Sequence, residues 1–348
     1  MKTQILTVDP LNPDSEAIAA AARLLRAGEL VAFPTETVYG LGANAMDAAA
    51  LGRIFTAKQR PRSDPIIAHI ASLDQLPELT RDLPDAVHEL AAEFWPGPLT
   101  FILKRSPAVP DAIAEGRDTI AVRMPAHSVA HALLKAAQIP VGAPSANTFT
   151  RPSATTAAHV DEDLGGRIAM ILDGGPTTIG LESTVLDLTG PSPRVMRPGG
   201  VTLEALREKL PGVEFAPSYV SEADGSASPG QMLKHYSPRA TVRLYRSDRP
   251  AEALRAMARD AAEATAQGLS VGALVCDEDA AALGAVAVET LGPQDDLEAL
   301  GRRLFIGLRQ LDARGADLIL VRDPGRAGLG AALWDRLLRA AEGVVIDC

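Results

Sequence analysis

The order of hydrophobic and polar positions along the first 200 residues predicts alternating helices and strands. DSEAIAAAARLLRAGE carries apolar residues at helical spacing, has Asp14 or Ser15 as a candidate cap, and stops at Gly28. The run LVAF then predicts a strand that leads into the loop FPTETVYGLGANA, residues 33–45. Helices are also expected in AVHELAAEF, in SVAHALLKAAQ and from Ser153 onward. Further strands are expected in PIIAHI, LTFILKR, TIAVRM, PVGAP, IAMILD, STVLDL and PRVMRPG.

A change of pattern separates this part of the chain from its end. Residues 210–230, LPGVEFAPSYVSEADGSASPG, are rich in Pro, Ser and Gly and show little periodicity, which is typical of a linker. From Ala240 the predicted strands TVRLY, SVGALVC, AVAVET, DLILV and GVVID alternate with helices such as LEALGRRLFIGLRQLDARG. This regular alternation predicts a small parallel α/β domain. We therefore expect an N-terminal domain over residues 1–209, a linker over 210–239 and a C-terminal domain over 240–348.

Composition narrows the class of protein. The 348 residues, 47% hydrophobic and 22% charged, are enough for two globular domains. A net charge of -10 argues against coating nucleic acid by bulk electrostatics, although a local basic patch can lie on an acidic protein. Cys276 and Cys348 are far apart and form no disulfide or metal framework, as expected in a reducing compartment. With no apolar leader and no run of the ~20 residues that span a bilayer, the sequence predicts a cytoplasmic protein without membrane contact.

Three cations lie close together in AKQRPRSDPIIAHI. Lys58, Arg60 and Arg62 fall between a predicted helix and a predicted strand that ends near His69. Lysine is a compact charge and arginine a bidentate fork, and both suit phosphate oxygens. A solvated basic turn would show the same residues, so both interpretations remain open at this point.

A predicted strand in TIAVRMPAH places Thr119 and Arg123 four residues apart, on the same face. An arginine that points inward beside a hydroxyl would bind a carboxylate or a phosphate. The alternative is an edge-strand arginine that pairs with a surface acid.

Small hydroxyl and amide side chains gather in three later segments. Such loops bind anions where a helix begins, but they also serve as plain capping boxes and turns. GAPSANTFTRPSATT contributes Ser145, Asn147, Thr148, Thr150, Ser153 and Thr155, and GLESTVLDL and VMRPGG add Ser183, Thr184 and Arg197.

Several familiar motifs are missing or weak. The sequence contains no G-x-x-x-x-G-K-[ST], and GLGANA lacks the third glycine of a dinucleotide fingerprint. His127 and His131 have a zinc-compatible spacing without a third ligand nearby, which favours a structural role. GRAGLGAAL, around Gly325, could mimic a phosphate loop, but a lone glycine-rich turn is weak evidence.

Taken in order, FPTETVYGLGANA, KQRPRSDPIIAHI, TIAVRMPAH, APSANTFTRPS, LESTVLDL and RPGG closely resemble the YrdC-type domain of threonylcarbamoyl-AMP synthases, over roughly residues 7–207. SPGQMLKHYSP resembles the S-P-G…H-Y-x-P segment of the long form of that family. The resemblance implies a catalytic domain whose twisted α/β sheet forms an open, positively lined cavity. A smaller Rossmann-like parallel α/β domain would follow the linker.

The resemblance also implies a nucleotidyltransferase reaction. L-threonine, bicarbonate and ATP would give threonylcarbamoyl-AMP and pyrophosphate, for the threonylcarbamoyladenosine modification of tRNA. Magnesium would be carried by the ATP phosphates rather than by a metal site of the protein. The product would pass to a downstream tRNA threonylcarbamoyltransferase, and contact with tRNA itself is not required.

Site residues are carried over by position in the motifs. The positions that match threonine-binding residues are Thr35, His69, Arg123, Ala143 through its backbone, and Ser183. Those that match ATP-binding residues are Lys58, Arg62, Thr119, Ser145, Ser153 and Arg197, with Arg60 as a further phosphate contact and with Lys58 and Arg62 as the catalytic cations. We also expect SPGQMLKHYSP to fold over the cavity, with His235 and Tyr236 contacting nucleotide.

Two other functions fit such a domain. It could be an RNA-binding module that uses a basic concavity, although the acidic net charge and the 4% aromatic content disfavour this. It could also serve carbamoyl transfer in metallocentre assembly, but the zinc-finger and acylphosphatase-like segments of that architecture are missing.

Overall fold

The chain forms two compact units. The computed structural model describes residues 2–61, 64–217 and 233–348. The first unit contains Met1–Phe149, Ser153–Thr178 and Glu182–Gln231, and the second contains Thr150–Pro152, Ile179–Leu181 and Met232–Cys348.

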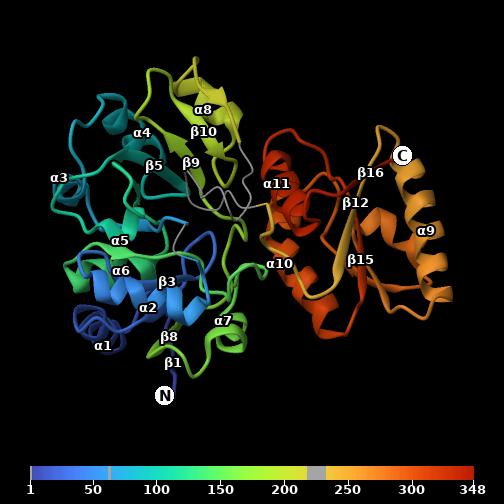
Figure 1. The fold of residues 1–348 in the computed structure, drawn as a ribbon, viewed down its shortest axis with the longest axis horizontal. Coiled ribbons are helices and arrows are strands. Elements are labelled where there is room, and N and C mark those ends of the chain that lie inside the picture. Colours follow the sequence, from blue (N-terminus) through green and yellow to red (C-terminus); the bar gives the residue numbers. More distant parts are fainter. Residues whose placement is uncertain (1, 62–63, 218–232) are drawn as a thin grey trace. The chain divides into compact units, whose positions relative to one another are not determined.

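A mixed sheet forms the centre of the first unit (Figure 1). Its strands lie side by side in the order β1-β8-β2-β3-β7-β4-β6-β5-β9-β10-β11. In sequence order they are β1 Gln4–Thr7, β2 Val31–Phe33, β3 Gly40–Asn44, β4 Ile67–His69, β5 Leu99–Lys104, β6 Thr119–Arg123, β7 Val141–Gly142, β8 Met170–Asp173, β9 Thr184–Asp187, β10 Arg194–Arg197 and β11 Glu214–Phe215.

Helices of the first unit begin mostly at side-chain caps. Asp14 accepts hydrogen bonds from the backbone of Glu16 and Ala17 and so caps α1, as expected, and Asp47 caps α2 in the same way. The helices are α1 Ser15–Arg26, α2 Ala48–Lys58, α3 Leu76–Leu79, α4 Ala86–Phe94, α5 Asp111–Ala114, α6 Ser128–Ala137, α7 Ala157–Leu164 and α8 Leu203–Lys209, with a short 3₁₀ turn at Leu73–Gln75.

The expected helix start at Ser153 is wrong. Helix α7 begins at Ala157, where the Thr156 hydroxyl accepts a hydrogen bond from the His159 amide. Before it, the chain is held in an extended path because the Ala154 carbonyl accepts a hydrogen bond from the Tyr39 amide. The Ser153 hydroxyl is therefore available for a partner other than a helix terminus.

Helices cover both faces of this sheet. In β2, Val31 and Phe33 pack into a hydrophobic cluster with Leu25 of α1 and residues of α6, whereas Ala32 belongs to a second cluster that includes Leu51 of α2. This alternation follows from the two-residue period of a strand. Burial on both faces keeps the central strands rigid, so polar side chains at their ends are held in place.

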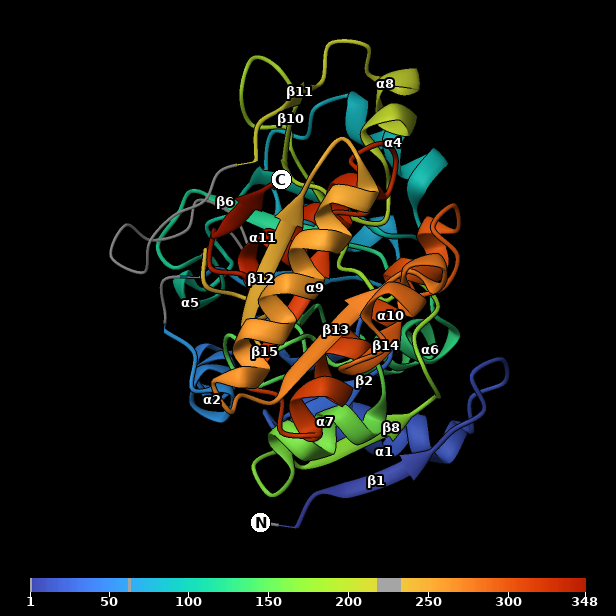
Figure 2. The same ribbon diagram turned by 90° about the vertical axis from the view of Figure 1, so that its right-hand side faces the viewer.

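The second unit is a parallel α/β sheet, as the sequence predicts. Strands β12 Thr241–Arg246, β13 Val271–Val275, β14 Ala287–Thr290, β15 Leu318–Arg322 and β16 Val345–Asp347 pair in parallel in the order β14-β13-β15-β12-β16. Helix α9 (Pro250–Ala266) covers one face, and α10 (Leu297–Ala313) and α11 (Gly330–Ala340) cover the other (Figures 1 and 2). A 3₁₀ segment at Asp277–Leu283 precedes β14.

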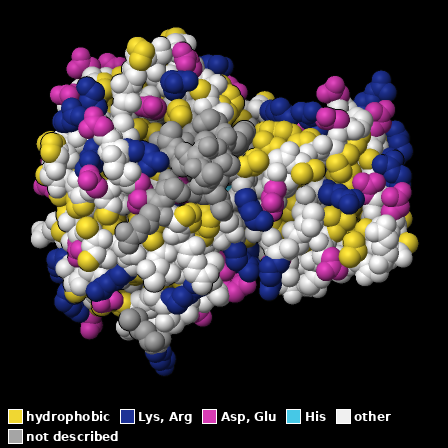
Figure 3. Space-filling model, viewed as in Figure 1, with side chains coloured by type: hydrophobic (Ala, Val, Ile, Leu, Met, Phe, Trp, Pro, Cys, Tyr) yellow, Lys and Arg dark blue, Asp and Glu magenta, His cyan; other side chains and the backbone are white. Residues whose placement is uncertain are grey.

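The described surface carries mixed charge. On the face shown in Figure 3, Lys and Arg side chains are interspersed with Asp and Glu over each unit. In the described ranges no helix is both long and apolar enough to cross a bilayer.

Candidate active site

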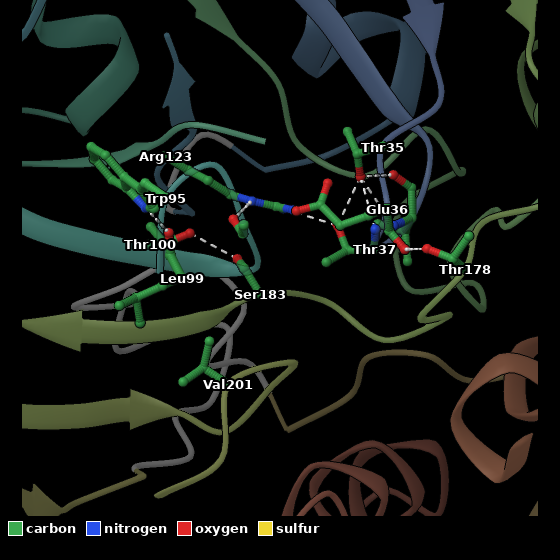
Figure 4. A network of polar contacts seen from close by, with 12 residues as sticks. Thr35, Glu36, Thr37, Trp95, Leu99, Thr100, Arg123, Thr178, Ser183 and Val201 are labelled. Carbon is green, nitrogen blue, oxygen red and sulfur yellow. Dashed lines mark hydrogen bonds and ion pairs between the residues drawn. The ribbon is translucent and has the colours of Figure 1, made fainter. Parts of the chain in front are cut away.

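Arg123 is a buried arginine whose guanidinium is fully engaged. It is the last residue of β6, and only 3% of it is exposed. Its Nε donates to the Gly97 carbonyl at 3.1 Å, Nη1 to the Thr37 hydroxyl at 2.9 Å, and Nη2 to the Glu36 carboxylate at 2.6 Å. Figure 4 shows Arg123 pointing along this line toward Glu36 and Thr37. One terminal nitrogen, Nη2, therefore already holds a carboxylate, and the other holds a hydroxyl.

The loop after β2 supplies the other side of this contact. The Thr35 hydroxyl donates to the Val38 carbonyl at 2.6 Å, lies 2.8 Å from the Thr37 hydroxyl, and accepts from the amides of Thr37 and Val38. Such a side-chain turn fixes the backbone without a helix or strand. Glu36 is thereby held against Arg123, and its Oε2 has no hydrogen-bond partner among the described residues.

His69 lies beside Arg123 as a neutral imidazole. It ends β4 and pairs in register with Arg123 of the parallel strand β6. Burial, and then the positive charge of Arg123, lower the pKa of His69 from 6.5 to about 3. Its Nδ1 lies 3.2 Å from the Ile67 carbonyl, a distance at which Nδ1 can donate a proton to that oxygen.

This burial predicts acid sensitivity. The folded pKa of His69 lies below the unfolded value, so the unfolded chain binds more protons between pH 3 and 6.5 and folding stability falls as pH falls through that range. We expect the melting temperature of the native protein to drop more steeply from pH about 6.5 to about 4.5 than that of His69→Gln. His88→Gln, at an exposed position, is the control and should keep the native slope. Equal slopes for all three proteins would contradict a buried neutral His69.

Ser183 belongs to a second polar group at the start of β9. Its hydroxyl lies 2.8 Å from the Thr100 hydroxyl of β5, and its carbonyl accepts from Arg197 Nε at 3.2 Å and Nη2 at 3.0 Å. Strand β5 runs antiparallel to β6 and parallel to β9, so the starts of β5 and β9 lie at the sheet edge where β6 ends at Arg123. Figure 4 shows Ser183 and Thr100 beside Arg123 in this way.

Gly199 of the RPGG segment is packed against this group. A Cβ at Gly199 would lie 2.3 Å from the Glu182 carbonyl oxygen and 2.4 Å from the Ser183 carbonyl carbon. We expect Gly199→Ala to lower the free energy of unfolding by about 2 kcal/mol or more, because backbone atoms cannot yield as a side chain can. Denaturant unfolding checks this, with Gly212→Ala as the control, since nothing lies within 4 Å of a Cβ there. Similar losses for both variants would show that close approach is not the cause.

Lys58 ends α2 inside the protein. Its Nζ donates to the carbonyls of Ser145 and Asn147, both at 2.5 Å, so it ties the hydroxyl-rich loop to the helix. Burial, and next the nearby Arg60, lower the pKa of Lys58 well below its usual value. A lysine of this kind gains from an anionic partner, which would favour the charged form.

The other predicted phosphate contacts have partners of their own. Arg60 is buried against the Asp64 carboxylate at 2.8 Å and donates to the carbonyls of Asp64 and Pro65. Ser153 donates to the buried Glu182 carboxylate. Thr119 begins β6, opposite Lys104 and at the far end of that strand from Arg123.

Ala143 lies beside the strand that ends at His69. Its backbone amide donates to the Ile67 carbonyl at 2.9 Å, so its carbonyl is the backbone group that remains for a ligand. Arg62 and residues 218–232, which include the first part of SPGQMLKHYSP, lie outside the described residues.

His235 and Tyr236 are buried in the second unit. Tyr236 has a positive φ of 60° and stacks on Phe305, with ring centroids 5.3 Å apart. The His235 ring lies 4.1 Å from the Tyr236 ring, and the guanidiniums of Arg336 and Arg339 lie over Tyr236 at 5.4 and 5.7 Å. The expected contact of His235 and Tyr236 with nucleotide stays a prediction.

The sequence motifs did not predict several residues of this site. Glu36 and Thr37 stand in the FPTETVYGLGANA loop, but nothing local indicates that they meet Arg123, which is 86 residues or more away in sequence. Thr100 looks like an ordinary strand residue, and Glu182 like a turn residue. Among the described residues, no group of three or more His, Cys, Asp or Glu could hold a metal ion, and His127 caps α6 through Nδ1.

Comparisons with known proteins identify the same two parts. Residues 23–199 match the family described as "Telomere recombination", and residues 201–342 match "Threonylcarbamoyl-AMP synthase, C-terminal domain". A threonylcarbamoyl-AMP synthase of Pyrococcus abyssi is 44% identical, over 93% of this chain and 94% of the relative. One of Bacillus subtilis is 40% identical, over 99% of this chain and 100% of the relative.

Solved structures agree with this assignment. The crystal structure of P. abyssi Sua5 complexed with L-threonine matches with a TM-score of 0.93 at 42% identity, over 99% of this chain and 100% of the other. Escherichia coli YciO matches with a TM-score of 0.52 at 28% identity, over 57% of this chain and 96% of its own. The expected fold is confirmed, and the chain belongs to the threonylcarbamoyl-AMP synthase family of nucleotidyl-transferring enzymes.

Proposed function

We propose that this chain makes threonylcarbamoyl-AMP and pyrophosphate from L-threonine, bicarbonate and ATP. The observation that carries the proposal is the buried Arg123, whose Nη2 already binds one carboxylate in a site whose neighbours are hydroxyls and a neutral histidine. The relative crystallised with L-threonine supports threonine as the amino acid.

Threonine is proposed to bind with its carboxylate on Arg123. Bidentate pairing would require Glu36 to give up its place on Nη2, so Glu36 marks the position of a substrate carboxylate. Thr35, Ser183 and the Ala143 carbonyl would contact the rest of the amino acid. Neutral His69 adds no positive charge that would repel the substrate amine.

ATP is proposed to bind through cations and hydroxyls. Lys58 and Arg62 would contact the phosphates as the catalytic pair, and the remaining contacts would come from Arg60, Thr119, Ser145, Ser153 and Arg197. Arg60 could turn from Asp64 to phosphate only if another donor replaced it there. Magnesium would arrive on the ATP phosphates, where it neutralises charge.

The chemistry needs positioning rather than a protein nucleophile. Bicarbonate supplies CO2 by losing hydroxide, and the threonine amine attacks that CO2 and loses a proton, which leaves a carbamate and water. A carbamate oxygen then attacks the α-phosphorus, and the bond to pyrophosphate breaks as pyrophosphate leaves. Cations around the phosphate oxygens stabilise the charge that develops there. A covered site would protect the carbamate, which loses CO2 readily in water.

The wider role follows from the product. Threonylcarbamoyl-AMP would be consumed by a tRNA threonylcarbamoyltransferase to modify tRNA in the cytoplasm. Direct contact between this chain and tRNA is not needed for that role.

Pyrophosphate release tests the proposal. Purified protein with ATP, magnesium and bicarbonate is expected to release pyrophosphate with L-threonine and much less with L-serine or without an amino acid. Pyrophosphate release that does not depend on threonine would overturn the proposal and favour an RNA-binding module. A gel shift with tRNA would then detect that binding.

A further inference from the structure

The second unit has a crevice at the edge where its strands end. Strands β12 and β15 are neighbours in the sheet and run in parallel. After β12 the chain continues into α9 on one face, whereas after β15 it continues into α11 on the opposite face (Figure 1). Loops that leave neighbouring strands in opposite directions open a crevice at the carboxyl ends, which is where open α/β sheets bind ligands.

A cavity of about 540 Å³ lies at this position. Residues 246–248 and 250 line it after β12, residues 322–326 line it after β15, and Gln294 from the connection between β14 and α10 also contributes. This volume falls within the range of small-molecule sites. The cavity consists entirely of described residues of the second unit, so it is separate from the site around Arg123.

Three arginines line the cavity, and each of them is paired with a carboxylate. Its lining contains Arg246, Arg322 and Arg326 against Asp248 and Asp323. The side chain of Arg322 is 7% exposed and is anchored by Asp279 at 2.7 Å and by Gln294 at 2.9 Å. A guanidinium held by a carboxylate and an amide in this way is fixed in place.

The other two arginines have donors to spare among the described residues. Arg246 donates through Nε to Asp347, and Nη1 and Nη2 make no hydrogen bond there. Arg326 lies over the Trp334 ring at 3.8 Å and is 3.7 Å from the Asp323 carboxylate, with no hydrogen bond from its guanidinium. Two guanidiniums with unused forked donors suit the oxygens of a phosphate group.

The loop after β15 is shaped to approach a ligand closely. Asp323 accepts a hydrogen bond from the Gly325 amide, and Gly325 and Gly328 both have positive φ, at 101° and 55°. This loop, the GRAGLGAAL segment of the sequence, leads into α11 at Gly330.

We propose that this cavity binds a small molecule through its phosphate group, as a second ligand site of the protein. Arg246 and Arg326 contact the phosphate oxygens, and Arg322, held by Asp279 and Gln294, fixes part of the lining. The ligand is either free phosphate or a nucleotide such as AMP, because the cavity is large enough for both and the recognised group is the same.

Hydrogen exchange of the full chain tests this site directly. Amides of residues 323–330 are expected to exchange at least about threefold more slowly in millimolar inorganic phosphate than in sodium chloride of equal ionic strength, because a ligand that binds the closed state suppresses opening. A parallel sample with AMP separates the two sources: greater protection than with phosphate indicates a nucleotide, and equal protection indicates the phosphate group alone.

Variants distinguish this cavity from binding elsewhere. Arg246→Ala and Arg326→Ala, whose side chains are 44% and 48% exposed, should each remove the protection at residues 323–330. Arg255→Ala, on an exposed part of α9, should keep it. No protection in the native chain, or protection that survives in both cavity variants, overturns the proposal. Because the readout is local exchange and not pyrophosphate release, this result is independent of the proposed synthase activity.

Discussion

Arg123→Lys is expected to lower kcat/KM for L-threonine by about 100-fold or more, which corresponds to about 2.7 kcal/mol of lost transition-state binding. A lysine has one point of charge and cannot reproduce the fork that now reaches Gly97, Thr37 and Glu36 together. The site is buried, so the loss is not screened by water. Threonine-dependent pyrophosphate release at varied threonine concentration measures it.

The matched control is Arg81→Lys. Arg81 also pairs with a carboxylate, since its Nη2 lies 2.7 and 2.6 Å from the two carboxylate oxygens of Asp118, but this pair is on the surface. Exposed pairs of this kind contribute little, so kcat/KM should stay within about twofold of native. A similar loss in both variants would mean that Arg123 has no special role in binding.

The variant Glu36→Gln distinguishes a role of Glu36 in threonine binding from a role in stabilising the fold. If Glu36 occupies the place of a substrate carboxylate, removing its charge should leave threonine affinity equal or higher. If Glu36→Gln instead loses as much activity as Arg123→Lys, the Arg123–Glu36 pair only supports the fold. A matching fall in the melting temperature of Glu36→Gln would confirm that role.

Lys58→Met is expected to lower kcat/KM for ATP by about 100-fold or more. It removes the buried charge proposed to contact phosphate and leaves the carbonyls of Ser145 and Asn147 without their donor. Lys135→Met, at an exposed position of α6, is the control and should keep native kinetics and stability. ATP dependence of pyrophosphate release and thermal unfolding are measured together. A variant that is less stable but keeps native kcat/KM for ATP would assign Lys58 to the fold alone.

The pH profile adds a second check on Lys58. Burial and Arg60 lower its pKa in the free enzyme, so kcat/KM for ATP should begin to fall at a lower pH than an exposed lysine would require. Activity falls as pH rises because the charged form of Lys58, which is present below its pKa, is the form that binds phosphate. A profile flat up to the pH at which exposed lysines titrate would contradict this role.

The sequence by itself determined the elements and the class of each unit. Apolar residues at helical spacing, with Asp14 as the cap, predicted α1. The regular alternation of strands and helices after Ala240 predicted the parallel sheet. Both predictions succeed because the spacing of apolar residues depends on which face of each element is buried. Strand periodicity placed Arg123 on the same face as Thr119, but only the structure decided that this arginine points inward. Ordered motifs carried the family resemblance, which the comparisons then confirmed.

Only the tertiary structure decided which groups meet. Glu36 contacts Arg123 across 87 residues, Arg60 is buried on Asp64, and Tyr236 lies in the interior of the second unit. Helix α7 starts later than its hydroxyl-rich sequence suggests, because the Ala154 carbonyl is taken by Tyr39. These outcomes depend on packing between distant segments, and local spacing contains no information about it. The crevice between β12 and β15 likewise arises only once both strands lie side by side.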